Sequence, residues 1–387
     1  MLQIDTIYEF LYQELFDRFA FWFPNKGVIK ADDVDLSDII VFTPTDALET
    51  KMFFYDQEPF IPILAESYLK LFDSSPRSSV LITSEYSNDV DQCLLKNNYH
   101  SMYYFFHGFA ALDWYRGYYA LNYNKLIVKQ YKNDFISFNR IINNDRSYRI
   151  YFVSLLKEQG LLEKGLVSFN VTDNLFDDWR DETSDVNSKL SDYAKQHAET
   201  HLVDVDKLVI DRASIHGSAS ASILRTIDRI NLNNDTLTVD AFWYIVTETV
   251  FYYDKLHLTE KIFKPIASKQ PFMLLAAPGN LAYLKSYGFK TFDSVIDESY
   301  DTIQDNDLRT EAVVEQLHWY CNLTPGEKTD IIQQLEPIIQ HNFDHFYGEF
   351  RHIITRELLG NTKALFKEIG YDDSHINYTN IYHVLTH

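Results

Sequence analysis

The run TEKIFKPIASKQPFMLLAAPGNLAYLKSYGFKTF, residues 259–292, establishes the fold class, because it alternates helical and strand patterns more clearly than the rest of the chain. Thr259 is typical of a helix cap, and Gly288 is typical of a residue that closes a helix. The pattern predicts helices over 259–268 and 280–288, a strand running into a turn over 271–279, and a strand over 289–292. Strands that alternate with helices build mainly parallel sheets, so we expect an α/β fold.

The same alternation continues on the amino-terminal side of this run. Short apolar segments typical of strands are separated by longer segments whose apolar residues recur at helical spacing. The expected strands are 38–44, 52–59, 79–85, 102–108, 133–140, 165–170 and 241–249, and the expected helices are 62–72, 89–98, 147–162 and a segment near 219–230. This pattern predicts doubly wound, Rossmann-like domains.

The length of the chain favours two domains. A chain of 387 residues is long for one compact core, and the polar, tyrosine-rich stretch around 120–132 is the natural boundary. We therefore expect a first domain over 1–130 and a second over 131–325. Residues 326–387 show helical spacing and could pack back against the first domain.

The composition excludes several classes of protein. Hydrophobic residues make up 46% of the chain, which excludes general disorder. The 35 Lys and Arg residues against 56 Asp and Glu residues give a net charge of −21, so a nucleic-acid partner would need a local basic patch. The two cysteines, Cys93 and Cys321, lie far apart, which indicates a reducing compartment and no structural zinc.

No membrane insertion is expected. Residues 1–23 place charged side chains among apolar residues at helical spacing, as in a packed amphipathic helix rather than a signal peptide. No apolar run approaches the roughly 20 residues that span a bilayer. We expect a soluble, cytoplasmic protein.

The segment 247–264 offers groups that suit a nucleotide. It leads from a strand to a helix start at Thr259, where free amides and the helix dipole favour an anion. Lys261 and Lys264 share a side of this helix and would add positive charge for a diphosphate. The carboxylate of Glu260 can accept hydrogen bonds from paired sugar hydroxyls. The alternative is an ordinary capped start of an amphipathic helix.

A second basic group follows the expected strand 133–140. Arg140 ends that strand, and Arg146 and Arg149 lie three residues apart at the start of the next helix, a donor set that suits phosphate oxygens. The alternative is that these are surface arginines paired with Asp145 or Glu158.

These motifs resemble those of a known family. The pattern V-T-E-T followed by K-L-H-L-T-E-K, residues 246–261, is similar to the donor-binding motif of α-1,3-fucosyltransferase-type glycosyltransferases. The longer run Thr259–Asp293 is similar to uncharacterised, largely phage and bacterial, glycosyltransferase-like proteins. Similar proteins also carry an N-R…R…R element and a D-Q-E-P turn, which Asn139–Arg149 and Asp56–Pro59 match.

The resemblance implies a GT-B fold, with an acceptor-side domain first, a nucleotide-sugar domain second and no catalytic metal. Glu260 would then hold the ribose and Lys261 the diphosphate. Arg140 or a nearby arginine would neutralise the leaving group, and Glu248 would lie near the donor sugar. Thr249-Val250 replaces the Asn-Ser usual in the fucosyltransferases, so the resemblance does not specify the sugar.

An inverting transfer needs a carboxylate that deprotonates the acceptor hydroxyl. Glu58 in the YDQEP turn is the first candidate and Asp56 the second, because the turn ends an expected strand. The alternative is a rigid strand end with solvated acids, since Pro59 stiffens the turn. His107 and Asp113 are acceptor-side candidates, and the alternative for His107 is a core position.

No metal is expected at the site. His341 and His345 lie four residues apart on an expected helix but lack the glutamate of H-E-x-x-H, and the D-x-D pairs do not end a clear strand of the second domain. No G-x-x-x-x-G-K-[ST], G-x-G-x-x-G or G-x-S-x-G motif occurs. The expected reaction therefore needs no cofactor, with the nucleotide sugar as a substrate.

Three hypotheses follow. The first is a glycosyltransferase that moves a sugar from a nucleotide-sugar donor to an acceptor hydroxyl, for example on a glycan, with inversion and without metal. The second is a phage-type enzyme that glycosylates hydroxymethylated bases in modified DNA, in the host cytoplasm. The third is a degenerate GT-B module that binds a glycan or a protein partner without catalysis.

Overall fold

The structure is a computed structural model, and it describes residues 40–42, 50–55, 59–62, 78–115, 129, 131–139, 141–142, 144–170, 178–180, 189–205, 207–208, 240–370, 373–374 and 376–386. The chain divides into two compact units. Unit 1 comprises Met1–Asp113 and Gly348–His387, and unit 2 comprises Trp114–Tyr347. Residues 348–387 therefore belong to unit 1. The domain limits suggested by the sequence, at residues 130 and 325, stay a prediction.

Unit 1 is built on a small, mainly parallel sheet. Its strands, in spatial order, are β1 (Ile40–Phe42), β2 (Thr50–Tyr55), β3 (Ser78–Thr83) and β5 (His100–Tyr103), and a short extended segment, β4, spans Tyr86–Ser87. β2, β3 and β5 run parallel, and β1 is antiparallel to β2. The helix α3 (Asn88–Asn97) begins at Ser87, whose hydroxyl accepts a hydrogen bond from the amide of Val90.

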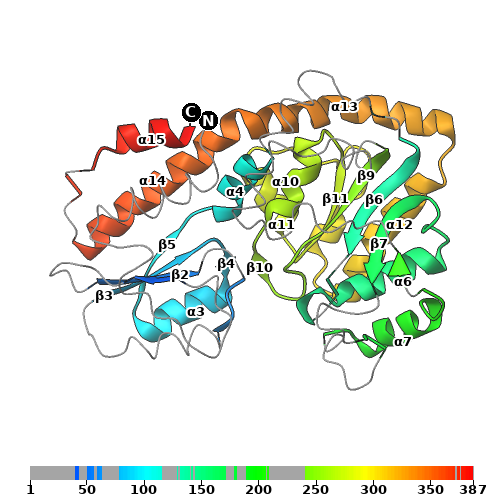
Figure 1. Ribbon diagram of the computed structural model, residues 1–387, viewed down its shortest axis with the longest axis horizontal. Coiled ribbons are helices and arrows are strands. Elements are labelled where there is room, and N and C mark those ends of the chain that lie inside the picture. The colour runs from blue at the N-terminus through cyan, green and yellow to red at the C-terminus, as the bar shows by residue number, and fades with distance from the viewer. Residues whose placement is uncertain are drawn as a thin grey trace. The chain divides into compact units, whose positions relative to one another are not determined.

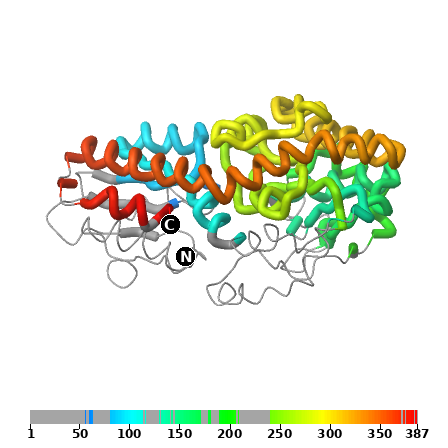
Figure 2. Tube along the Cα trace, turned by 90° about the horizontal axis from the view of Figure 1, so that it is seen from above, coloured from blue at the N-terminus to red at the C-terminus, as the bar shows by residue number. Residues whose placement is uncertain are grey.

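Two carboxyl-terminal helices belong to this unit. α14 (Glu349–Ile369) packs against β5, where the Asn361 amide donates to the carbonyl of Tyr103 at 2.8 Å. The Nδ1 atom of His100 lies 2.6 Å from a carboxylate oxygen of Glu368. α15 (Tyr378–Thr386) runs beside α14 (Figure 2).

The predicted strand 102–108 is wrong beyond Tyr103. The amide of Tyr104 still donates to the carbonyl of Thr83, but the amide of Gly108 donates to the carbonyl of Phe105, and the helix α4 (Phe106–Trp114) follows. Residues 102–110 are all buried, so the segment shows no alternation. A short run buried on all sides has the same apolar pattern in a strand and in a helix.

Unit 2 contains a mainly parallel sheet. Its strands, in spatial order, are β11 (Phe272–Leu275), β9 (Ala241–Thr247), β6 (Asn133–Asn139), β7 (Gly165–Asn170) and β8 (Lys207–Leu208), and a short segment, β10, spans Lys255–Leu256. The first four run parallel, and β8 is antiparallel to β7. All seven residues of β9 are buried, as expected for a central strand covered on both faces.

Helices cover both faces of this sheet (Figure 1). α10 packs on β9 and β11, whereas α12 packs on β11 and α6, and α7 packs on α6. The helices that the structure describes in this unit are α6 (Tyr148–Glu158), α7 (Asp192–His201), α10 (Glu260–Ala267), α11 (Asn280–Ser286), α12 (Asn306–Cys321) and α13 (Pro325–Tyr347), with short 3-10 turns at Asn144–Arg146 and Ser299–Thr302. The arrangement is compatible with a Rossmann-like fold.

The predicted strand 289–292 is wrong, because these residues pair with no strand that the structure describes. Side chains accept hydrogen bonds from backbone amides that would bond a neighbouring strand in a sheet. The Asn342 side chain accepts from the amide of Lys290 at 2.8 Å, and the Glu298 carboxylate accepts from the amide of Phe292 at 2.6 Å.

The predicted strand 165–170 is confirmed, and Gly288 follows α11 with a φ of 92°. The expected helices at 1–23, 62–72 and near 219–230 lie outside the described residues, apart from residue 62.

The helices that the structure describes were also compared with what a bilayer requires. None of them combines the length and apolar character of a membrane span.

The packing of β7 against β6 gives a stability prediction. A Cβ atom added at Gly165 would lie 2.4 Å from the Phe135 ring, which is fully buried. We expect Gly165→Ala to lower the free energy of unfolding by about 1–3 kcal/mol, because the core must shift to admit the methyl group. Thermal unfolding followed by circular dichroism measures this change.

The control is Gly360→Ala in α14, where an added Cβ meets nothing within 4 Å. This change should stabilise the helix by about 0.5–1 kcal/mol. Equal melting temperatures for Gly165→Ala and the wild type would contradict the tight packing.

Candidate functional site

The chain of unit 2 leaves the centre of the sheet in two opposite directions. From β6 it passes through α6 to β7 on one side, and from β9 it passes through α10 to β11 on the other. β6 and β9 are neighbours, so the segments that follow them diverge at the carboxyl edge of the sheet. Open α/β sheets bind ligands at such a switch point. The segment Glu248–Thr259 follows β9 directly.

The side chain of Glu248 is fully buried immediately after β9. One carboxylate oxygen accepts from the amide of Thr259 at 3.2 Å, and the other accepts from the Thr259 hydroxyl and from the amide of Thr249 at 3.3 Å. Glu248 therefore joins the two ends of the segment that connects β9 to α10. Its expected place near a donor sugar stays a prediction.

Thr259 is the N-cap of α10, as the sequence predicts. Its hydroxyl accepts from the amide of Lys261 at 3.4 Å while it donates to Glu248. The ammonium group of Lys261 lies 3.0 Å from the Thr259 hydroxyl, 3.1 Å from the Thr249 hydroxyl and 3.2 Å from a Glu260 carboxylate oxygen. The structure thus brings Thr259, Glu260 and Lys261 together at one point.

The exposure of these side chains differs. The Lys261 side chain is 35% exposed and that of Glu260 is 12% exposed, so their ion pair lies at the surface of the helix start. The Lys264 ammonium lies 4.8 Å from the centre of the Phe138 ring near the end of β6. Both lysines therefore lie close to the carboxyl ends of β6 and β9.

Arg149, which the sequence suggests as a phosphate ligand, bonds backbone carbonyls in this structure. Its side chain is 4% exposed, and its guanidinium donates to the carbonyls of Ile141 at 2.8 Å and Thr247 at 2.6 Å. It pairs with neither Asp145 nor Glu158 among the contacts described. It instead ties the segment after β6 to the end of β9. Tyr148 adds to this link, since its hydroxyl donates to the carbonyl of Glu248 at 2.6 Å.

The remaining arginines of the predicted group are placed differently. Arg146 closes the turn Asn144–Arg146 and is partly buried, beside Asp145, which accepts a hydrogen bond from the Tyr253 hydroxyl at 2.8 Å. Arg140 lies outside the described residues.

Sequence reasoning missed Arg309 and Asn280, which hold this region from other elements. Arg309 is 1% exposed and donates to the carbonyls of Phe251 and Ala276 at 2.8 and 3.0 Å. Burial lowers its pKa to about 10, which still leaves it charged at neutral pH. Asn280 is fully buried and accepts from the amide of His257 at 3.0 Å. Both residues bond backbone groups, which every residue type carries, so their partners leave no recognisable sequence motif.

In unit 1 the acceptor-side candidates are only partly described. Glu58, Asp56 and the side chain of Asp113 lie outside the part of the chain that the structure describes. His107 is 6% exposed and its ring meets that of Phe106 edge to face at 5.3 Å, so it occupies the core position that the sequence left as the alternative.

A buried carboxylate that the sequence did not single out holds the amide of Phe60. Glu85 is 2% exposed and accepts from the amide of Phe60 at 2.7 Å and from the Ser87 hydroxyl at 2.6 Å. It lies just beyond β3, which is parallel to β2. The signal was the polar end of the predicted strand 79–85.

The histidines considered as metal ligands bond backbone carbonyls. The Nε2 atom of His341 lies 3.1 Å from the carbonyl oxygen of Gly288, and that of His345 lies 2.7 Å from the carbonyl oxygen of Tyr287.

Comparisons of the chain with family models, with curated proteins and with solved structures give no match.

The Glu248–Thr259 contact gives a stability prediction. We expect Thr259→Ala to lower the free energy of unfolding by at least about 2 kcal/mol, because it removes an N-cap and leaves a buried carboxylate with fewer donors. Thr259→Ser keeps the hydroxyl and should recover most of this loss. Urea unfolding of the three proteins measures the difference.

Thr324 provides the control, because its hydroxyl makes a similar cap at α13 with Glu327 on an exposed surface. Thr324→Ala should cost only about 1 kcal/mol. The account fails if the two Thr→Ala substitutions destabilise equally.

Proposed function

We propose that the protein is a nucleotide-sugar-dependent glycosyltransferase whose donor binds to unit 2 beside Thr259, Glu260 and Lys261. One observation carries the proposal: the Thr-Glu-Lys helix start lies next to the sheet position where β6 and β9 diverge. Doubly wound sheets bind ligands there, and a helix start supplies positive potential for phosphate. The resemblance of 246–261 to a donor-binding motif supports the same place.

Lys261 is the proposed diphosphate ligand. Two of its three partners are neutral hydroxyls, and the third is the neighbouring Glu260 carboxylate. A bound diphosphate would replace this carboxylate at the ammonium group, because an ion pair at a partly exposed site is weak. Glu260 would then accept hydrogen bonds from the ribose hydroxyls that adjoin the diphosphate.

Glu248, Arg149 and Arg309 form a supporting frame rather than a binding surface in this proposal. All three are buried and bond backbone or hydroxyl groups of the segments after β6 and β9. Such bonds fix the positions of Thr259 and Lys261 before a ligand arrives. Pre-organised groups bind more strongly, since they lose less freedom on binding.

The chemical step follows from general requirements of inverting transfer. A carboxylate removes the proton of the acceptor hydroxyl, the oxygen attacks the anomeric carbon, and the bond to the nucleoside diphosphate breaks. Glu58 is the proposed base and Asp56 the alternative. Lys261, Lys264 and Arg146 or Arg140 would stabilise the negative charge of the departing diphosphate, so the proposed transfer needs no metal ion. The GT-B arrangement of the units is part of this proposal.

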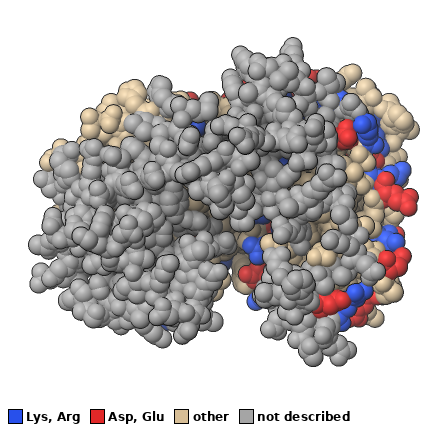
Figure 3. Space-filling view, viewed as in Figure 1, with Lys and Arg blue, Asp and Glu red and all other residues tan. Residues whose placement is uncertain are grey.

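The described surface of unit 2 does not itself support a DNA acceptor. In Figure 3, the described Lys and Arg side chains of unit 2 are interspersed with Asp and Glu side chains. The described residues on this face therefore form no continuous basic surface of the kind that attracts a phosphate backbone.

Nucleotide binding tests the proposal. We expect UDP, GDP, CMP or ADP to bind the wild type in isothermal titration calorimetry, and Lys261→Ala to weaken that binding at least about tenfold through loss of a charge-assisted contact. Lys290→Ala is the matched control, because this exposed lysine lies elsewhere in unit 2. Circular dichroism checks that both variants fold.

Two results would contradict the proposal. One is the absence of binding by the wild type with every nucleotide of the panel and its sugar conjugates. The other is equal nucleotide affinity of folded Lys261→Ala and Lys290→Ala.

A further inference from the structure

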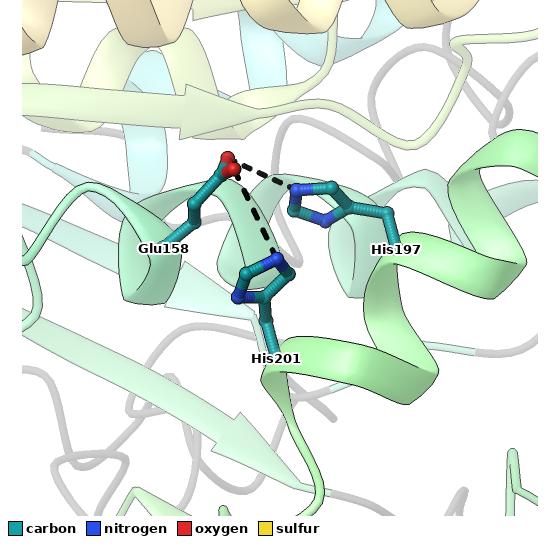
Figure 4. Close-up of side chains that lie close together, drawn as sticks. All are labelled: Glu158, His197 and His201. Atoms are coloured by element: carbon teal, nitrogen blue, oxygen red, sulfur yellow. Dashed lines mark hydrogen bonds and ion pairs between the residues drawn. The ribbon is translucent and has the colours of Figure 1, made fainter.

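A cluster of metal-ligating side chains lies in unit 2, where α7 packs against α6 (Figure 4). Glu158 is the last residue of α6, and His197 and His201 lie one turn apart on α7. The three side chains point toward one another, and one ligand atom from each lies within 4.8 Å of the other two. Two histidines at this spacing and a carboxylate form a frequent ligand set of transition metals.

The distances suit an ion in the middle. The Nε2 atom of His197 lies 3.0 Å from one oxygen of Glu158, and that of His201 lies 3.9 Å from the other. Tetrahedral ligands at about 2.1 Å from zinc lie about 3.4 Å from one another, between these two values. The second distance is too long for a hydrogen bond.

Ser154 contacts the far side of the His197 ring. Its hydroxyl lies 2.7 Å from the carbonyl oxygen of Tyr151 and 2.8 Å from His197 Nδ1, while Nε2 of the same ring faces a Glu158 carboxylate oxygen at 3.0 Å. The nitrogen that faces the cluster is therefore Nε2, and Nδ1 is held by a neighbouring side chain.

We propose that Glu158, His197 and His201 bind one divalent transition-metal ion of the zinc class. The donor set of two imidazoles and one carboxylate favours zinc, cobalt or nickel over magnesium or calcium, which prefer oxygen ligands. Ser154 supplies the contact to the non-ligating nitrogen that metal-bound histidines usually make. The side chain of Glu158 is 45% exposed, so water can occupy the fourth position.

The ion would fasten α7 to the end of α6. The buried residues of α7 are Ala194 and Ala198, small side chains that bury little apolar surface. Metal ligation across the two helices would supply stability that this packing lacks. The cluster lies at the carboxyl end of α6, whereas Tyr148 and Arg149 at its amino end contact the end of β9. The proposed metal site is therefore separate from the proposed donor site and places no metal in the transfer reaction.

Metal binding by the full chain tests the inference. The protein, freed of purification tags and stripped with a chelator, is titrated with Zn²⁺ against a chromophoric indicator. We expect one tight site in the wild type, and a loss of affinity of at least about 100-fold in His201→Ala and in Glu158→Gln, since contacts one step removed from a metal are already worth 10–100-fold. Both side chains are partly exposed, so the substitutions are compatible with folding.

His318→Ala on the exposed surface of α12 is the matched control and should bind like the wild type. Zn²⁺ should also raise the melting temperature of the wild type and of His318→Ala but not of His201→Ala. Co²⁺ should give the wild type the visible absorption of a tetrahedral site, a measurement that needs no variant. Absence of a stoichiometric site in the wild type, as expected for a simple imidazolium–carboxylate pair, would overturn the inference. Zn²⁺ affinity in His201→Ala equal to that of the wild type would also overturn it.

Discussion

The candidate site depends on the hydrogen bonds that the buried carboxylate of Glu248 accepts. A buried carboxylate is costly unless its oxygens accept hydrogen bonds, and Thr249 and Thr259 supply them. Meeting this requirement brings the start of α10 back to the end of β9. The position of Lys261 follows, because its ammonium group bonds the same two threonines. The geometry of the site is therefore a consequence of satisfying one buried charge.

Other buried polar groups extend this constraint across the second sheet. Arg149 reaches the carbonyls after β6 and at the end of β9, and Arg309 reaches the segments after β9 and β11 from α12. Each guanidinium neutralises partial negative charge where the carbonyls of parallel strands converge. Buried cations thus hold this edge of the sheet, and the side chain of Lys261 is partly exposed there.

The sequence predicts the α/β class and the cap at Thr259, because these depend on local periodicity and on one hydroxyl. It extends the strand that ends at Tyr103 too far, because the apolar run continues into the helix α4. It also predicts a strand over 289–292, where backbone amides bond distant side chains instead. It places Lys261 at a helix start, but it does not show that Arg149 is buried, because burial cannot be read from spacing. The pairing of α6 with α7 brings Glu158 to His197 and His201. Only tertiary structure shows that contact, although the four-residue spacing of the histidines was a visible signal.

The central claim is that a nucleoside diphosphate binds where β9 passes into α10. Hydrogen–deuterium exchange by mass spectrometry, with and without a saturating nucleotide, measures this directly. The account predicts slower exchange in peptides that cover 246–264 and unchanged exchange in α7. Slower exchange confined to other parts of the chain, or no change at saturation, would contradict it.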